Sequence, residues 1–142
     1  MGNSWQSPVT GEPSHGTWHD IVAPTDANLL SQVVVAGTWY TVTFPVGTGT
    51  GKVPTGTTKV KATVRYYLAS TTVNSIAYYR PYGSGAAVNA ARKIASIYTA
   101  SNVNSMSCSQ IELPTDSSGR VEVEGDVSGP TLEISNAFAY SM

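Results

Sequence analysis

The sequence predicts an all-β fold: a two-sheet antiparallel sandwich, jelly-roll-like, with about eight strands and an extended N-terminal arm. Serine and threonine supply about a quarter of the 142 residues, whereas the helix-forming residues Glu, Lys and Leu are scarce. Apolar and polar side chains alternate with period two in several segments. Gly, Pro, Ser and Asn interrupt these segments about every ten residues, a spacing typical of sandwiches and jelly rolls.

The N-terminal segment differs from the rest of the chain. Residues 1–16 contain Gly and Pro breakers and no alternation, so we expect an extended arm, followed by a single β-sandwich domain over residues 17–142. Trp5 is a lone aromatic in this polar segment. Two interpretations stay open: a frayed terminus, or an arm that docks its tryptophan in a pocket.

The first half of the domain is expected to hold four strands, over residues 17–23, 29–36, 38–46 and 58–68. Pro45 ends the third because it cannot donate to a ladder. That segment places Tyr40, Val42 and Phe44 on one face and Trp39, Thr41 and Thr43 on the other. The fourth alternates strictly, with Val60, Ala62, Val64, Tyr66 and Leu68 on the predicted inner face.

The second half is expected to hold strands over residues 75–81, 94–99, 105–113, 120–124 and 131–140, with one helical turn within 86–95. Asp116 and Gly119 predict a tight turn between two of these strands, since Asp bonds the backbone ahead and Gly tolerates positive φ. Val121 and Val123 are expected to point inward. Asn136 interrupts the apolar face of the last strand, so it marks either a bulge or a satisfied polar position.

Composition excludes several classes of protein. Only 12% of the residues are charged and the formal net charge is −1, so the basic excess of a nucleic-acid binder is absent. No segment approaches the apolar length of a membrane span, and the first residues do not form a secretory signal. Cys108 is the sole cysteine, which excludes an internal disulfide, and we expect it to be buried and inert.

The sequence offers no convincing catalytic or metal site, and we predict no cofactor. His19 and Asp20 are adjacent, and adjacent strand residues point to opposite faces. His15 and His19 would converge on a helix, but their region reads as extended. The acidic residues near the last turns form, in our interpretation, a solvated strand face, ahead of a calcium site or a glycosidase pair. These residues are Asp116, Glu122, Glu124 and Asp126.

Aromatic residues are the strongest candidates for a functional surface. Trp39, Tyr67 and Tyr79 fall on strand faces that we expect to be outer. Such rings meet a partner protein, fill the core or stack on a sugar, and we favour these roles in that order. The predicted partner-interface residues are Trp5, Trp18, Trp39, Tyr67, Tyr79 and Tyr82.

Four segments together carry a resemblance to a known class of protein. They are the strand Lys61–Tyr67, the segment Tyr79–Ser84 (YRPYGS), the turn and strand Leu113–Val123 (LPTDSSGRVEV) and Leu132–Ile134. Over residues 58–140 the chain resembles β-sandwich modules of accessory virion proteins of tailed bacteriophages, such as capsid decoration (cement) proteins, head fibres and tail appendages. Similar modules occur in bacterial surface proteins. The resemblance implies a jelly-roll-like fold, frequent trimers and structural rather than catalytic work.

We therefore expect a capsid decoration protein, made in the host cytoplasm and placed on the outer capsid surface of a virion. Its expected partners are the major capsid protein and further copies of itself in a homotrimer, with Trp5 and Trp18 as the anchor. The alternative is a head-fibre or tail appendage that binds host-surface glycans through Trp39, Tyr67, Tyr79 and Tyr82. A third hypothesis is a hydrolase with a carboxylate site at Asp116, Glu122 and Glu124.

Overall fold

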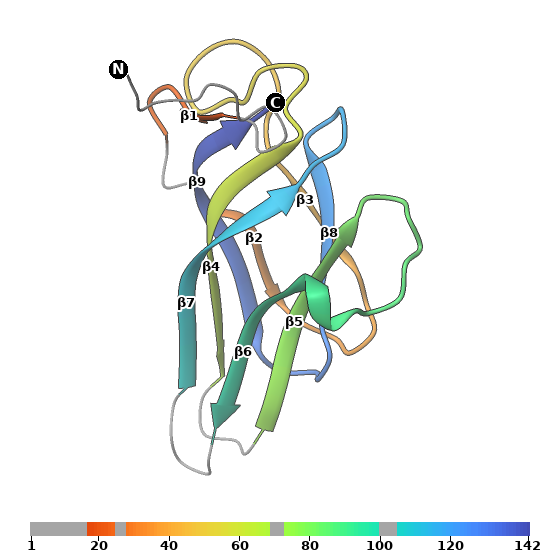
Figure 1. Ribbon diagram of the computed structural model, residues 1–142. Helices are drawn as coiled ribbons and strands as arrows, with labels where there is room; N and C mark the ends of the chain where they lie inside the picture. Colours follow the sequence, from red (N-terminus) through yellow and green to blue (C-terminus); the bar gives the residue numbers. More distant parts are fainter. Residues whose placement is uncertain (1–16, 25–27, 69–72, 100–104) are drawn as a thin grey trace, which may run out of the picture.

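The computed structural model describes residues 17–24, 28–68, 73–99 and 105–142, which form two antiparallel sheets (Figure 1). The predicted all-β sandwich is confirmed. The predicted arm, with Trp5, lies outside the described residues. Within the described part, no helix is long and apolar enough to cross a membrane.

The described residues form nine strands and one 3-10 turn, the latter inside the predicted helical segment. The strands are β1 (Trp18–Asp20), β2 (Asn28–Val33), β3 (Tyr40–Thr43), β4 (Lys59–Leu68), β5 (Val73–Pro81), β6 (Lys93–Thr99), β7 (Ser105–Pro114), β8 (Arg120–Gly125) and β9 (Thr131–Ser141). The 3-10 turn η2 spans Ala90–Arg92, where the Asn89 side chain accepts a hydrogen bond from the Ala91 amide. Every predicted strand is present, and the N-terminal ones are shorter than expected.

The strands pair as one long ribbon folded over on itself. The first sheet, called sheet A, has the order β1-β9-β4-β7, with β2 also paired to β9, and sheet B has the order β3-β8-β5-β6. The pairs β2·β9, β3·β8, β4·β7 and β5·β6 are therefore nested one inside the next. Eight strands nested in this way and divided between two sheets form a jelly roll.

The core lies between the two sheets and follows the predicted alternation. On β4, the inward residues from Val60 to Tyr66 are fully buried. Sheet B contributes Val42, Val121 and Val123, which are also fully buried. Because burial of apolar surface is the main force that holds two sheets face to face, these alternating residues are what fixes the sandwich.

Tyr79 is not on the outer face, contrary to our expectation. It packs against the buried core, and its cross-strand neighbour on β8 is the fully buried Val123. The outward residue Tyr78 is itself only 9% exposed. Because the outward Tyr78 and the inward Tyr79 are both shielded from solvent, alternation alone does not reveal which face is inner.

Asn136 marks a bulge in β9, one of the two predicted alternatives. Its φ is 53°, and the pairing of β4 with β9 passes from Lys61–Ala139 to Thr63–Ser135. Strand β9 therefore holds two extra residues here, which preserves its alternation. The Asn136 Oδ1 atom is buried with no hydrogen-bond partner in the described part of the chain, so it is not a satisfied polar position.

Cys108 is exposed, so the expectation of a buried thiol was wrong. It lies on β7, which is the edge strand of sheet A, and its cross-strand neighbour is the outward residue Arg65. An edge strand is covered on one side only, and its outward side chains meet solvent. The order of strands in the sheet, which decides this exposure, is not visible in the local alternation.

Candidate partner-binding face

The outer face of sheet B gathers charged and aromatic side chains in cross-strand rows. On β8, Glu122 and Glu124 point outward, because the alternate residues between them face the core. In the antiparallel register with β5, Arg80 is opposite Glu122 and Tyr78 is opposite Glu124. We call the set Trp39, Arg80, Tyr82, Asp116, Arg120 and Glu122 the arginine–aromatic face.

Arg80 is held from three directions. Its Nε atom donates a hydrogen bond of 2.7 Å to Glu122 Oε1, and its Nη1 atom donates one of 3.0 Å to the Ala86 carbonyl. Its guanidinium carbon lies 4.2 Å from the centroid of the Trp39 ring. The Arg80 and Glu122 side chains are only 17% and 16% exposed. The guanidinium is therefore fixed before any partner arrives.

Arg120 repeats this arrangement at the turn between β7 and β8. Its Nε and Nη2 atoms lie 3.0 and 2.9 Å from Asp116 Oδ2. Its guanidinium carbon lies 3.9 Å from the centroid of the Tyr82 ring. The other oxygen of Asp116 accepts from the Ser118 and Arg120 amides, at 2.9 Å each. Desolvation raises the pKa of Asp116, but hydrogen bonds from Arg120 and Ser118 outweigh it and lower the pKa.

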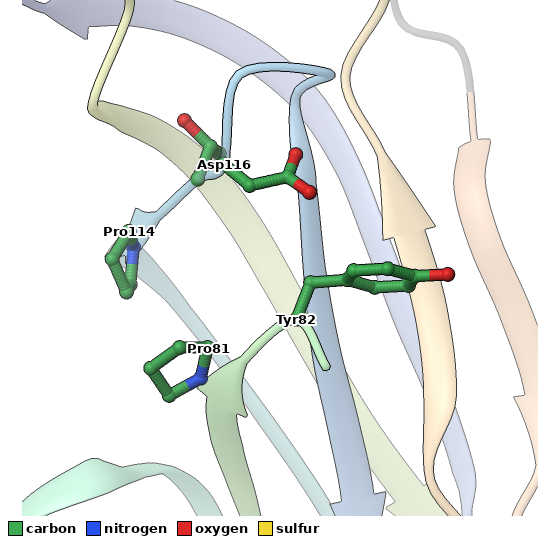
Figure 2. Close-up of a pocket in the computed structure, with 5 residues that line it drawn as sticks. Pro81, Tyr82, Pro114 and Asp116 are labelled. Carbon is green, nitrogen blue, oxygen red and sulfur yellow. The ribbon is translucent and has the colours of Figure 1, made fainter. Parts of the chain in front are cut away.

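A small pocket of about 110 Å³ adjoins this second stack and joins the two sheets. Figure 2 shows the Pro81 and Pro114 rings on one side and the Tyr82 ring and Asp116 carboxylate on the other. Pro81 ends β5 in sheet B and Pro114 ends β7 in sheet A. Two proline rings and one aromatic ring beside a carboxylate suit a small partner side chain better than an extended substrate.

The outer face of sheet A carries two further stacks. The Arg65 guanidinium carbon lies 4.5 Å from the Tyr67 ring centroid, and Arg65 bonds both carboxylate oxygens of Glu133 at 3.0 and 2.9 Å. Near β1, the Lys61 ammonium lies 4.4 Å from the Trp18 ring centroid. A second pocket, of about 200 Å³, is lined by Lys61, Gln110, Ile111 and Glu112.

Four of the six predicted interface residues therefore lie beside a cation. Trp39 and Tyr82 share the outer face of sheet B, whereas Trp18 and Tyr67 lie on the outer face of sheet A. Tyr79 packs inward as described above, and Trp5 lies outside the described residues. Their role in binding a partner stays a prediction.

The acidic residues are not the uniformly solvated face that we expected. Glu124 is 3% exposed, and desolvation raises its pKa, partly opposed by Arg80 and assisted by Asp126. Asp116 and Glu122 each bond an arginine. In the described residues, no three His, Cys, Asp or Glu side chains are grouped so that they could hold a metal ion.

The cations of these stacks were not among the predicted site residues. A signal was present in one case: Arg65 and Tyr67 are two residues apart on the same strand, a spacing that places both on one face. The contact of Arg120 with Tyr82 needs the pairing of β5 with β8, which no local spacing specifies.

No protein-family model matches this sequence, and no curated protein matches it. The resemblance to phage accessory virion modules therefore remains a prediction.

Proposed function

We propose that this protein is a structural, decoration-type component of a tailed-phage capsid that binds capsid subunits through the arginine–aromatic face. The observation that carries the proposal is the pair of stacks Trp39–Arg80–Glu122 and Tyr82–Arg120–Asp116. The virion setting rests on the sequence resemblance, and the binding surface rests on these contacts.

The composition of the face is that of a protein-binding surface. Trp, Tyr and Arg are the residues most enriched among those that dominate binding energy in protein interfaces. Each immobilised side chain costs about 0.5–1.5 kcal/mol on association. Arg80 is already bonded to Glu122 and Ala86, so much of this ordering precedes binding.

The same stacks argue against sugar binding at this face. An aromatic ring binds a sugar by offering a bare face, and the guanidinium of Arg80 already covers one face of Trp39. The Tyr82 ring carries Arg120 in the same way. A guanidinium that lies on a ring and bonds a carboxylate presents its remaining donors to carbonyl oxygens of a partner backbone.

The position of the pocket supports a bridging role. The pocket joins β5 of sheet B with β7 of sheet A, at the end of the sandwich formed by the turn before β8. A capsid loop that inserted a small side chain there would contact both sheets at once. Copies seated across subunit seams would raise the barrier to rupture by adding buried contacts.

The test compares virus particles made from a genome that encodes this chain with particles made from the same genome without its gene. We expect the particles that lack the protein to release their genome at a lower temperature and in milder low-salt shock. Equal release curves for the two kinds of particle would contradict the proposal.

A matched pair of variants tests the face itself. Tyr82→Ala removes a ring that lies on Arg120, whereas Tyr98→Ala removes an exposed ring from β6, outside the face. We expect Tyr82→Ala to lower the number of bound copies per particle at limiting protein and Tyr98→Ala to leave it unchanged. Equal occupancy for both variants would place the binding surface elsewhere.

A second candidate function, recognition of host-surface glycans, is favoured by one observation. The pocket on sheet A is lined by an ammonium, an amide and a carboxylate, from Lys61, Gln110 and Glu112, which are groups that hydrogen-bond sugar hydroxyls. A glycan array probed with the purified protein tests it. Reproducible binding to one sugar class that is lost in Gln110→Ala would favour this function over decoration.

A further inference from the structure

Strand β7 presents an open edge of sheet A. It pairs with β4 over ten consecutive residue pairs, and no strand of the described residues pairs with its other side. Figure 1 shows β7 at the margin of the sheet, with β4 on its inner side. Met106 is 60% exposed, and Cys108, Ser109 and Gln110 are exposed as well. A regular row of backbone donors and acceptors therefore faces outward.

This edge lacks the features that normally prevent pairing with another chain. Residues 105–111 include no charged residue and no proline, and the register with β4 has no bulge. The other edges are interrupted or short. The pairing of β2 with β9 breaks between Asn28 and Leu30, the pairing of β5 with β6 breaks after Ala77, and β3 has only four residues.

We propose that β7 binds β7 of a second copy of this chain, in antiparallel orientation, about a two-fold axis that passes beside Cys108. The two copies of sheet A then form one continuous sheet. This inference concerns the protein in solution, does not depend on the capsid proposal, and puts a dimer in place of the homotrimer that the resemblance implies.

The residues around the axis favour a second copy as the occupant. With Cys108 opposite its own copy, Ser107 is opposite Ser109 and Met106 is opposite Gln110 in the partner. These side chains are small or uncharged, so no like charges meet at the axis. The nearest charged residue on the strand, Glu112, lies toward the end of the ladder. An isologous contact of this kind closes after two copies.

The first measurement is the mass of the full chain by sedimentation under reducing conditions, over a range of concentration. We expect a monomer–dimer equilibrium that ends at two copies. A monomer at all concentrations would overturn the proposal. A trimer or larger ring would overturn it too, since pairing of β7 with β2 of the next copy is heterologous.

The second measurement uses the sole cysteine as a position marker. Residues directly opposite each other in an antiparallel pair have Cβ atoms about 4.5–5.5 Å apart, so a short bis-maleimide should join two Cys108 thiols. We expect a covalent dimer from the dimeric fraction and none from protein diluted to monomer. A dimeric fraction that does not cross-link would show that another surface forms the dimer.

Substitutions at the axis complete the test. Cys108→Lys places two ammonium groups opposite each other, and we expect the dimer dissociation constant to rise at least about tenfold. Cys108→Ser keeps the strand neutral, and Ser96→Lys adds a lysine to the exposed edge β6; both should leave the constant within about twofold. Unfolding midpoints check that Cys108→Lys is folded. An unchanged constant in folded Cys108→Lys would overturn the proposal.

Discussion

The two ends of strand β8 each bring together a glycine, an aspartate and a tyrosine. The tyrosine is exposed at one end and buried at the other. Before the strand, Gly119 adjoins Asp116, whose carboxylate bonds Arg120 beneath the exposed Tyr82 ring. At the far end of the strand, Gly125 is followed by Asp126, which accepts a hydrogen bond from Ser75. There the Tyr66 hydroxyl is buried and bonds Ser75.

At this buried end the hydrogen bonds connect the two sheets. Tyr66 Oη on β4 of sheet A lies 2.6 Å from Ser75 Oγ on β5 of sheet B. Ser75 Oγ in turn donates to Asp126 Oδ1 at 3.0 Å, and the same oxygen accepts from the Ile76 amide at 2.8 Å. At this end the buried Tyr66 and Ser75 hydroxyls link the two sheets, whereas the similar set at the other end lies on the outer surface, where we propose that a partner binds. Four predictions probe this difference.

The largest effect is expected from Gly119→Ala. A Cβ atom there would clash with the Phe44 carbonyl oxygen, and φ is +76°, so both the backbone just after β3 and the turn would have to move. We expect a loss of about 3 kcal/mol or more in the free energy of unfolding, measured with urea. Gly83→Ala is the control, since its φ is +73° with nothing within 4 Å. It should cost about 1 kcal/mol, from the backbone conformation alone. Equal losses would mean that the close approach is unimportant.

Gly125→Ala is expected to cost about 2 kcal/mol, through overpacking of the buried end. Its Cβ atom would lie 2.4 Å from Tyr66 Oη and 2.8 Å from Val34 Cγ2. Addition of Tyr66→Phe removes the nearer of these atoms, so the double variant should lose less stability than the sum of the two single variants. Strict additivity in urea unfolding would show that the hydroxyl is not what excludes a side chain here.

Tyr66→Phe alone is expected to cost about 1–2 kcal/mol, because it removes the buried hydrogen bond to Ser75 Oγ and leaves that hydroxyl only its bond to Asp126. Tyr67→Phe is the matched control on the next residue. Its hydroxyl bonds Glu133 at 3.3 Å on the half-buried outer face, where water replaces the bond. We expect a change in unfolding free energy below about 0.5 kcal/mol for the control. Similar losses for both would remove the distinction between inner and outer polar groups.

The smallest effects are on the pH dependence of stability, with opposite signs at the two ends of β8. The pKa of Asp116 is lowered, so its contribution is present above the ordinary aspartate pKa of 3.8 and is lost as the pH falls through the folded-state pKa. The pKa of Glu124 is raised by desolvation, so its contribution is present below 4.5 and is lost as the pH rises.

Two variants separate these contributions. Asp116→Asn should flatten the acid side of the stability curve, and Glu124→Gln should flatten the loss that begins above 4.5. Urea unfolding midpoints across this pH range provide the measurement. Curves that parallel the original protein in both variants would mean that neither carboxyl group is coupled to folding.

Much of the fold was predictable because the alternation in β4 and β8 is a direct record of the two faces of a sheet. Val60, Val64 and Val121 are buried as predicted. The turn before β8 was predictable as well, since the roles of Asp116 and Gly119 follow from local backbone chemistry.

The features that the sequence did not predict depend on which strands are neighbours in the two sheets. The inner position of Tyr79, the burial of Glu124 and the exposure of Cys108 all follow from strand order in the sheets, which alternation does not specify. The cation that lies on Tyr82 comes from β8, and only the pairing of β5 with β8 brings it there. Aromatic residues and the local Arg65–Tyr67 pair could therefore be proposed from the sequence, whereas the arginine partners of Trp39 and Tyr82 could not.

The nested ribbon has a consequence for synthesis on the ribosome. Strand β9 is central in sheet A, between β4 and the pair β1 and β2, and Gln32 pairs with Leu132, 100 residues later. A nascent chain that ends before Thr131 leaves the inner side of β4 without its neighbour. We therefore expect the jelly roll to close only after β9 has emerged from the exit tunnel, with slow kinetics typical of long-range strand pairing.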